Sequence, residues 1–324
     1  MQYIKIRKAR HRKQINMRAI ITGATGFIGQ WLVKELYRIG FDITVIAHNL
    51  KNVPDIWKEN IDVVKCDIAH YQDLQKHHFR YTNFDFFFHL AWAGTSGTER
   101  ADFNLQLKNS YAACEAVNLA KRLSCRRFIN AGSIMEYEAM TYVPQDGTEP
   151  SAGYMYSISK LTADFMAKTL AVWENIDYIN IIISNIYGAG EKSARFLNQL
   201  LRKLISNQKI PLTTGEQLYD FIYVTDAVRG IILAAQKGKN CSSYYIGNQA
   251  PQPLKQFILQ AKEVLKSDSE LAFGEVTFKG AKLTYKEFDT NKLYDLGFKT
   301  EISFQKGIQM TAEWIKKEGF SDGL

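Results

Sequence analysis

The stretch MRAIITGATGFIG, residues 17–29, decides the fold of this chain. It begins with Arg18–Thr22, a short apolar run of the kind that forms a strand buried on both faces of a parallel sheet. Glycines then recur at every third position, and apolar residues continue at helical spacing as far as Gly40, where we expect a helix to end. A strand, a glycine turn and a helix in this order predict a site for a dinucleotide. The glycines are Gly23, Gly26 and Gly29, and the helical stripe is Ile28, Leu32, Val33 and Leu36.

Each glycine of this turn has its own expected role. Gly23 allows the tight turn, Gly26 lets the backbone approach a pyrophosphate, and Gly29 lets helix and strand pack closely, so that the helix N-terminus faces the anion. The spacing G-x-x-G-x-x-G differs from the commoner G-x-G-x-x-G, and the alternative is a glycine-rich turn that binds no ligand. The correct periods on both sides favour the cofactor site. Its expected contacts are Gly23, Thr25, Gly26, Phe27, Ile28 and Gly29.

Bulk composition is that of an ordinary soluble globular protein. The 324 residues are 46% hydrophobic and 23% charged, and they suffice for one large α/β domain or for a Rossmann domain with a smaller partner. No apolar run approaches the roughly 18 residues that would span a membrane. The four cysteines form no C-x-x-C pair and are expected to be reduced thiols of a cytoplasmic protein.

The formal charge of +8 is concentrated at the N-terminus. Six cations lie within the first sixteen residues without an acid among them, and removing them from +8 leaves +2. This leader is either a basic arm for nucleic acid or an anionic membrane, or a disordered segment that precedes a functional start at Met17. We favour the second interpretation because the first strand begins there, and we expect neither a nucleic-acid nor a membrane partner. The cations are Lys5, Arg7, Lys8, Arg10, Arg12 and Lys13.

Further apolar runs alternate with helical patterns along the chain. This alternation predicts βαβ units and a doubly wound parallel sheet with helices on both faces, so that ligands bind at the carboxyl ends of the strands. The expected strands after the first are 43–47, 61–64, 84–90, 127–130 and 179–183, and the clearest helices are 104–123 and 157–173. We expect residues 17–184 and 213–248 to form the Rossmann domain, and 185–212 and 249–324 to form a smaller interleaved lobe, after a leader at 1–16.

Residues after the second strand bear on the choice of cofactor. An NAD site usually places a carboxylate about 20 residues beyond the glycines to hold the ribose hydroxyls, and this chain has His48, Asn49 and Lys51 there instead. Two cations would suit a 2′-phosphate, so we expect NADP(H) to be favoured over NAD(H). The alternative is that both are solvated loop residues.

The ends of the third and fourth strands add weaker signals. Asp67 and Ile68 follow the third strand, where an adenine ring can hydrogen-bond and pack. After the fourth strand, the stretch Leu90–Ala93 carries small residues that let the backbone lie against a cofactor, with Trp92 between two alanines.

The fifth strand and the helix after it supply the candidate catalytic residues. Ser133 lies at the strand end, and Tyr156 and Lys160 stand four residues apart, so they share a helix face. A tyrosine with an ordinary pKa near 10 is a poor acid or base at neutral pH, and we expect the neighbouring ammonium to lower that pKa. Ser133 can hydrogen-bond a substrate oxygen.

The chain has, in this order, a glycine turn after a strand, Ser133 at the end of a later strand, and Tyr156 four residues before Lys160. It thereby resembles an extended short-chain dehydrogenase/reductase of the nucleotide-sugar epimerase/dehydratase family. The similarity runs through nearly the whole chain from Met17. Further matching stretches are His89-Leu90-Ala91, Asn185-Ile186-Tyr187-Gly188, Asp220-Phe221-Ile222-Tyr223-Val224-Thr225-Asp226 and Leu296-Gly297-Phe298, followed by Gly307 and Trp314.

The resemblance implies a role for several residues. Ser133 and Tyr156 would flank the C4 oxygen of a nucleotide-diphosphate sugar, Lys160 would also hold the nicotinamide ribose, and Asn185 would contact the substrate. It also implies a homodimer that pairs helices 104–123 and 157–173 across a two-fold axis. We expect no metal site. Further cofactor contacts are expected at Asn109, Ala131 and Ser184, and further substrate contacts at Glu136, Arg195 and Tyr219.

Three departures from the family pattern matter. Tyr219 stands where the family often has an arginine for the substrate diphosphate, and Arg195 or Lys192 would have to replace it. Ile182 stands where another arginine is common. Dehydratases carry Asp-Glu directly after the catalytic Ser or Thr, and here those positions are Ile134-Met135, which argues against elimination chemistry.

Three functions remain open on these grounds. The leading hypothesis is NADPH-dependent reduction of a nucleotide-linked 4-keto-6-deoxy sugar at C4. The alternative is a 4-epimerase that retains NAD, which the missing ribose carboxylate disfavours. A redox sensor that binds NADP without turnover is the third, and the intact set of Ser133, Tyr156 and Lys160 weighs against it.

Overall fold

The computed structural model describes residues 16–278 and 280–318, and its centre is a seven-stranded parallel sheet. The strand order β11-β6-β5-β4-β1-β2-β3 is that of a doubly wound fold, which confirms the predicted fold class. The strands are β1 (Arg18–Thr22), β2 (Asp42–Ala47), β3 (Asp62–Lys65), β4 (Phe86–His89), β5 (Arg127–Ser133), β6 (Asp177–Ile183) and β11 (Ser242–Ile246).

Six of these strands agree with the apolar runs to within a few residues, and β11 was not expected. It pairs only with β6 and forms one edge of the sheet. Its first residues, Ser242 and Ser243, are polar and half-buried, so the strand lacks the continuous apolar run that marked the others.

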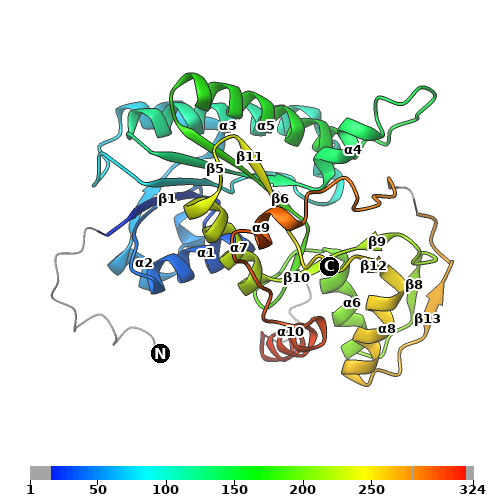
Figure 1. The fold of residues 1–324 in the computed structure, drawn as a ribbon. Coiled ribbons are helices and arrows are strands. Elements are labelled where there is room, and N and C mark those ends of the chain that lie inside the picture. The colour runs from blue at the N-terminus through cyan, green and yellow to red at the C-terminus, as the bar shows by residue number, and fades with distance from the viewer. Residues whose placement is uncertain (1–15, 279, 319–324) are drawn as a thin grey trace.

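Helices cover both faces of the sheet (Figure 1). The helices α3 (Phe103–Arg122) and α5 (Tyr154–Trp173) lie on one face, and α1 (Phe27–Arg38) and α7 (Val224–Lys237) lie on the other. The hydroxyl of Ser110 on α3 donates to the carbonyl of Ser159 on α5 at 2.8 Å, so these two helices lie side by side, as predicted for 104–123 and 157–173.

Alternate residues of each strand feed two separate cores. Phe87 is flanked in the sheet by Ile20 and Phe128, and all three pack beneath α3 and α5. Their chain neighbours Ile21 and Phe88 join the core on the α1 and α7 side. Because side chains alternate across a strand, this double burial produces the continuous apolar runs seen in the sequence.

The glycine turn has the backbone that the sequence predicted. Gly23 has φ +70°, and a Cβ there would lie 2.5 Å from the backbone nitrogen of Ala91. A Cβ on Gly29 would overlap the carbonyl oxygen of Gly23 and the Cα of Ala24. Any side chain at these two positions would push α1 away from β1 and β4.

A second group of elements lies beyond the carboxyl ends of β6 and β11 (Figure 1). The chain leaves the sheet after β6, returns to it for α7 and β11, and leaves it again, so this lobe is interleaved with the sheet as predicted. The boundaries given above remain a proposal. Its elements are β7 (Asn185–Tyr187) with β10 (Phe221–Tyr223), β8 (Ile210–Leu212) with β13 (Leu271–Phe273), β9 (Leu218–Tyr219) with β12 (Gln252–Pro253), α6 (Phe196–Ile205), α8 (Leu254–Leu265) and α10 (Phe304–Glu318).

Shorter helices complete the described chain. They are α2 (Asp55–Asn60), α4 (Met135–Thr141) and α9 (Asn291–Tyr294), with 3-10 turns at Leu50–Asn52, Ile68–Lys76 and Gly97–Ala101. Across residues 16–278 and 280–318, none of the helices combines the length and hydropathy needed to cross a lipid bilayer. The four cysteines are unpaired. The basic leader at 1–16 lies outside the described residues except for Asn16.

Candidate active site

The predicted cofactor residues gather at one edge of the sheet. They follow β1, β2, β3 and β4 in turn, and Ala131 lies near the end of β5. Because carboxyl ends of parallel strands share an edge, residues from five segments of the chain meet there, and doubly wound folds bind ligands in a crevice at this edge.

The turn between β1 and α1 fits a pyrophosphate. Gly26 is exposed, and no side chain caps the N-terminus of α1 at this position. The first N–H groups of a 12-residue helix therefore face an open surface. The close packing of Gly23 and Gly29 against the neighbouring backbone holds this cradle in place.

The loop after β2 contains a contact that the sequence did not suggest. His48 Nδ1 lies 2.8 Å from Asp67 Oδ2, and both side chains are solvent-exposed. The other oxygen of Asp67 accepts the backbone N–H of Ala69, and Asn49 accepts that of Lys51. The structure thus brings a carboxylate from the end of β3 to the loop in which the linear sequence has none.

Two expected cofactor contacts have their polar side-chain atoms occupied by the protein. The amide of Asn109 on α3 both donates to and accepts from the backbone of Ala93, at 2.8 and 3.0 Å, and Asn109 is 1% exposed. The Ser184 hydroxyl donates to the carbonyl of Ile246 at 2.6 Å. Both side chains therefore fix the loops that line the crevice instead of pointing into it, which corrects the expectation of direct contact.

The candidate catalytic residues come together as predicted. Ser133 ends β5, and Tyr156 and Lys160 lie in the first two turns of α5. The hydroxyl of Tyr156 interacts with the side chain of Ser133, and the ring of Trp92 packs edge-on against Tyr156 with 6.0 Å between ring centroids. Helix α5 begins at Tyr154, three residues earlier than expected, and this places Tyr156 in its first turn.

Lys160 is buried and has two partners in the structure. Its Nζ donates to the carbonyl oxygen of Ala131 at 2.8 Å and lies 3.7 Å from the centroid of the Trp92 ring. It is 6.0 Å from the centroid of the Tyr156 ring. Burial lowers the pKa of Lys160 to about 7, while Glu136 opposes that shift.

The pKa of Tyr156 departs from the predicted direction. Burial raises the pKa above its ordinary value, although the side chain of Ser133 and the positive charges of Arg100 and Arg195 act to lower it. The prediction that Lys160 leaves this phenol with a lowered pKa is therefore wrong for this structure, because desolvation outweighs the nearby cations. The phenol is held in its protonated form.

Glu136 was expected to contact substrate, and its position contradicts this. It is 1% exposed and lies behind Ser133, where it accepts the backbone N–H of Ser133 at 2.7 Å and the Nδ2 of Asn180 at 3.1 Å. Both carboxylate oxygens are thus occupied within the protein.

The second lobe brings three predicted substrate residues toward the same crevice. Asn185 donates from Nδ2 to the hydroxyl of Tyr285 at 3.1 Å, and Tyr219 stacks on Phe221. Arg195 is exposed at the N-terminus of α6, and its charge acts on Tyr156 and Lys160.

The two suggested replacements for the diphosphate arginine differ in their surroundings. Lys192 is paired with Glu318 at 3.2 Å, whereas within the described part of the chain Arg195 has no carboxylate within 4.0 Å. Arg195 is therefore the better of the two candidates.

A family model for the NAD dependent epimerase/dehydratase family matches residues 19–247. The chain belongs to this family. It is thus related to NAD(P)-dependent enzymes of nucleotide-sugar metabolism, and the resemblance found in the sequence is confirmed.

The relatives of this epimerase/dehydratase family member are distant but cover more than nine-tenths of its length. CDP-abequose synthase of Salmonella muenchen is 25% identical over 91% of this chain and 97% of its own. The dTDP-D-glucose 4,6-dehydratase of Bos taurus is 25% identical over 93% of this chain and 89% of its own. The Bordetella bronchiseptica enzyme WbmF, solved in complex with NAD+ and UDP, shares the fold with a TM-score of 0.76 at 21% identity, over 94% and 93% of the two chains.

One site residue of this family member was missed from the sequence. The guanidinium carbon of Arg100 lies 4.5 Å from the centroid of the Tyr156 ring, and its buried Nε lacks a hydrogen-bond partner among the described residues. Arg100 lies in the 3-10 turn Gly97–Ala101, which carried no recognised motif. Only its place soon after β4 pointed to the crevice.

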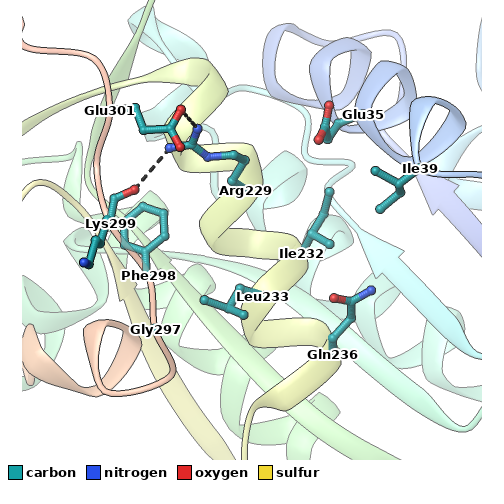
Figure 2. A pocket seen from close by; sticks show the side chains of 10 residues that line it. All are labelled: Glu35, Ile39, Arg229, Ile232, Leu233, Gln236, Gly297, Phe298, Lys299 and Glu301. Atoms are coloured by element: carbon teal, nitrogen blue, oxygen red, sulfur yellow. Dashed lines mark hydrogen bonds and ion pairs between the residues drawn. The ribbon is translucent and has the colours of Figure 1, made fainter.

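A surface pocket of about 400 Å³ lies apart from this crevice (Figure 2). It is formed by the C-terminal half of α1, by α7 and by the segment 297–301, where Arg229 pairs with Glu301 and donates to the carbonyl of Lys299. Helices of a βαβ unit run antiparallel to the strands, so Glu35 and Ile39 lie toward the amino ends of the strands. In the described chain, no three His, Cys, Asp or Glu side chains are grouped to hold a metal ion.

Proposed function

We propose that this protein is an NADPH-dependent reductase of a nucleotide-diphosphate 4-keto-6-deoxyhexose that acts at C4 of the sugar. A dinucleotide would be held by the glycine turn, by the loops after β2 and β4, and by Lys160. The observation that carries the proposal is the buried phenol of Tyr156 beside the side chain of Ser133 at the end of β5, because reduction of a ketone needs a proton donor.

The nicotinamide, when bound, supplies a hydride to C4. Tyr156 gives its proton to the C4 oxygen as negative charge develops there, and Ser133 hydrogen-bonds the same oxygen and orients the carbonyl. Lys160 holds the nicotinamide ribose and stabilises the phenolate that remains. Arg195 binds the diphosphate of the substrate, and Asn185 contacts the sugar.

The residues after Ser133 argue against elimination of water from a hexose. Such chemistry needs a carboxylate pair to move protons at C5 and C6, and the corresponding positions are Ile134 and Met135. Ile134 is buried in an apolar cluster with Ile182 and Tyr245. Glu136 does not replace the pair, because its oxygens are bound within the protein.

A second candidate is an NAD-dependent 4-epimerase, and the contact between His48 and Asp67 favours it. This contact brings a carboxylate to the loop after β2, where an NAD site usually has one for the ribose hydroxyls. The enzyme WbmF, which shares the fold, was solved with NAD+.

One assay separates the two candidates. A reductase, purified without cofactor, oxidises NADPH when a nucleotide-linked 4-keto-6-deoxyhexose is added. An epimerase instead releases tightly bound NAD on denaturation and interconverts hexoses without added cofactor. A panel with CDP, dTDP, UDP and GDP as the nucleotide identifies the base.

Substitution of His48 tests the cofactor preference. We expect the wild type to bind NADPH better than NADH, and His48→Asp to reverse this by at least about tenfold, or roughly 1.4 kcal/mol. The new carboxylate would repel a 2′-phosphate. Its negative charge would add to that of Asp67, which lies 2.8 Å from the histidine ring. Dissociation constants for both cofactors, from quenching of tryptophan fluorescence, measure the change.

His48→Asn is the matched control, because it removes the ring without adding a charge. It should weaken NADPH binding without improving NADH binding. A wild type that prefers NADH tenfold would overturn the assignment and would move the epimerase ahead of the reductase.

The outer faces of α3 and α5 support a homodimer. Three apolar side chains lie at helical spacing on α3 and six more lie on α5, all at least 42% exposed. Exposed apolar faces of this extent are typical of protein interfaces. They are Phe103, Leu107, Tyr111, Met155, Ile158, Phe165, Met166, Val172 and Trp173.

We therefore expect light scattering to give a dimer at micromolar concentration and Phe165→Glu to give a monomer. Burying two unpaired carboxylates at the centre of a two-fold interface is strongly unfavourable. Leu259→Glu on α8, where the leucine is 47% exposed away from this face, should remain dimeric. A monomeric wild type would contradict the proposal.

A further inference from the structure

A chain of buried polar side chains lies behind the reacting groups, and the mechanism above does not use it. Glu136, Asn180 and Asn130 are each at most 2% exposed. Glu136 Oε1 accepts the backbone N–H of Ser133, and Oε2 accepts Nδ2 of Asn180. Asn180 Oδ1 in turn accepts Nδ2 of Asn130 at 3.1 Å. These hydrogen bonds thus connect the second half of β5, helix α4 and the centre of β6.

Gly132 provides the space for this arrangement. A Cβ on Gly132 would lie 2.6 Å from both Glu136 Oε1 and Asn180 Oδ1, well inside van der Waals contact. The network therefore lies directly against the backbone that precedes Ser133.

Both carboxyl oxygens of Glu136 act as acceptors. Each accepts an N–H, an arrangement in which an ionised carboxylate is fully hydrogen-bonded within the protein. Lys160 donates to the carbonyl of Ala131, one residue before Gly132. Glu136 and Lys160 are thus two buried ionisable groups that both hydrogen-bond to the backbone of residues 131–133 at the end of β5.

The two charges also support each other. Burial raises the pKa of Glu136 and lowers that of Lys160, and each charge opposes the effect of burial on the other. Asp164 raises the pKa of Glu136 further, and Arg195 lowers that of Lys160 further. The other ionisable groups that interact with the pair are Tyr137, Tyr156 and Tyr178, which face Glu136, and His89, which faces Lys160.

We propose that Glu136 is a positioning residue of the reacting centre, which fixes the backbone of Ser133 and keeps the side chain of Lys160 in its ammonium form. This inference rests on the proposed function, because it assigns Glu136 a task only through Ser133 and Lys160. Glu136 itself touches neither sugar nor cofactor.

The titration of Lys160 tests the inference without substrate or cofactor. Lysine labelled with 13C at Cε reports its own protonation by NMR, and Lys160→Met assigns the signal. In Glu136→Gln we expect the midpoint of Lys160 to fall by about 1 to 3 pH units, as for loss of an adjacent opposite charge. A purely structural role of Glu136 would leave that midpoint where it is.

A double variant separates the charge from the hydrogen bonds. In Glu136→Gln the new amide faces the amide of Asn180 donor to donor. In Glu136→Gln with Asn180→Asp, the introduced glutamine accepts from Ser133 and donates to the introduced aspartate, which also accepts from Asn130. All three hydrogen bonds and the net charge return, so we expect the Lys160 midpoint to recover at least half of the loss.

Glu138→Gln is the matched control. Glu138 is a second buried carboxylate on α4, it accepts the hydroxyl of Ser157 at 3.0 Å, and its substitution should leave the Lys160 midpoint unchanged. An unchanged midpoint in Glu136→Gln, or an equal shift in Glu138→Gln, overturns the inference.

If the single variant fails to fold, the reciprocal measurement decides. Lys160→Met must raise the titration midpoint of Glu136. This midpoint is measured by NMR with 13C-labelled glutamate, and the signal of Glu136 is assigned by its absence from the variant Glu136→Gln with Asn180→Asp. A midpoint that does not rise overturns the inference. All of these readouts are independent of turnover, so failure of the NADPH assay is distinguishable from failure of this proposal.

Discussion

Tyr156→Phe is expected to lower kcat by about 10²- to 10⁴-fold, or roughly 3 to 5 kcal/mol of barrier, with little change in cofactor affinity. The substitution removes one oxygen and keeps the ring that packs against Trp92 and beneath Arg100. Single-turnover oxidation of NADPH measures the chemical step, and fluorescence titration measures cofactor binding.

Tyr154→Phe is the control for this prediction, because Tyr154 is a buried tyrosine of the same helix that stacks on Tyr142. It should keep most of the activity. Ser133→Ala should cost less than Tyr156→Phe, because water can partly replace one hydrogen bond. If Tyr156→Phe keeps more than about half of wild-type kcat while chemistry is rate-limiting, the role of Tyr156 is wrong and Tyr154 becomes the candidate donor.

Lys160→Met is expected to reduce both rate and cofactor affinity, because this ammonium is assigned two tasks. Loss of a hydrogen bond from a charged donor costs about 1.5 to 3 kcal/mol, which corresponds to a Kd weaker by about 10- to 100-fold. Removing the charge that stabilises the phenolate should lower kcat as well. Steady-state kinetics and fluorescence titration separate the two effects.

The pH dependence of binding gives this prediction a second readout. The ammonium is present below the pKa of Lys160, which burial lowers to about 7, so wild-type affinity should weaken as pH rises above that value. Lys160→Met should lose this dependence. Lys168→Met on the same helix should keep it, and a pH-independent wild type would contradict the assignment.

Much of the fold could be predicted from the sequence, because it depends on local patterns. Double burial of the sheet produced the apolar runs from β1 to β6, and Gly23 and Gly29 of the β1–α1 turn had steric reasons that the structure confirms. Strand β11 was missed because its serines interrupt the apolar pattern.

The candidate site was predictable in its main residues but not in its electrostatics. Ser133, Tyr156 and Lys160 stood out by type and spacing. The contact of Asp67 with His48 and the position of Arg100 over Tyr156 join segments that are distant in sequence. The burial of Glu136 depends on which face of α4 is covered. The direction of the Tyr156 pKa was missed because desolvation depends on the whole fold.

Transfer of deuterium tests the proposed reaction most directly. The protein is incubated with a nucleotide-linked 4-keto-6-deoxyhexose and NADPH deuterated at either face of nicotinamide C4, and the sugar product is analysed by NMR and mass spectrometry. The account predicts one deuterium at C4 of the sugar for each NADPH oxidised, from only one of the two labelled cofactors. A product without deuterium at C4, or inversion of a hexose at C4 without consumption of NADPH, would contradict it.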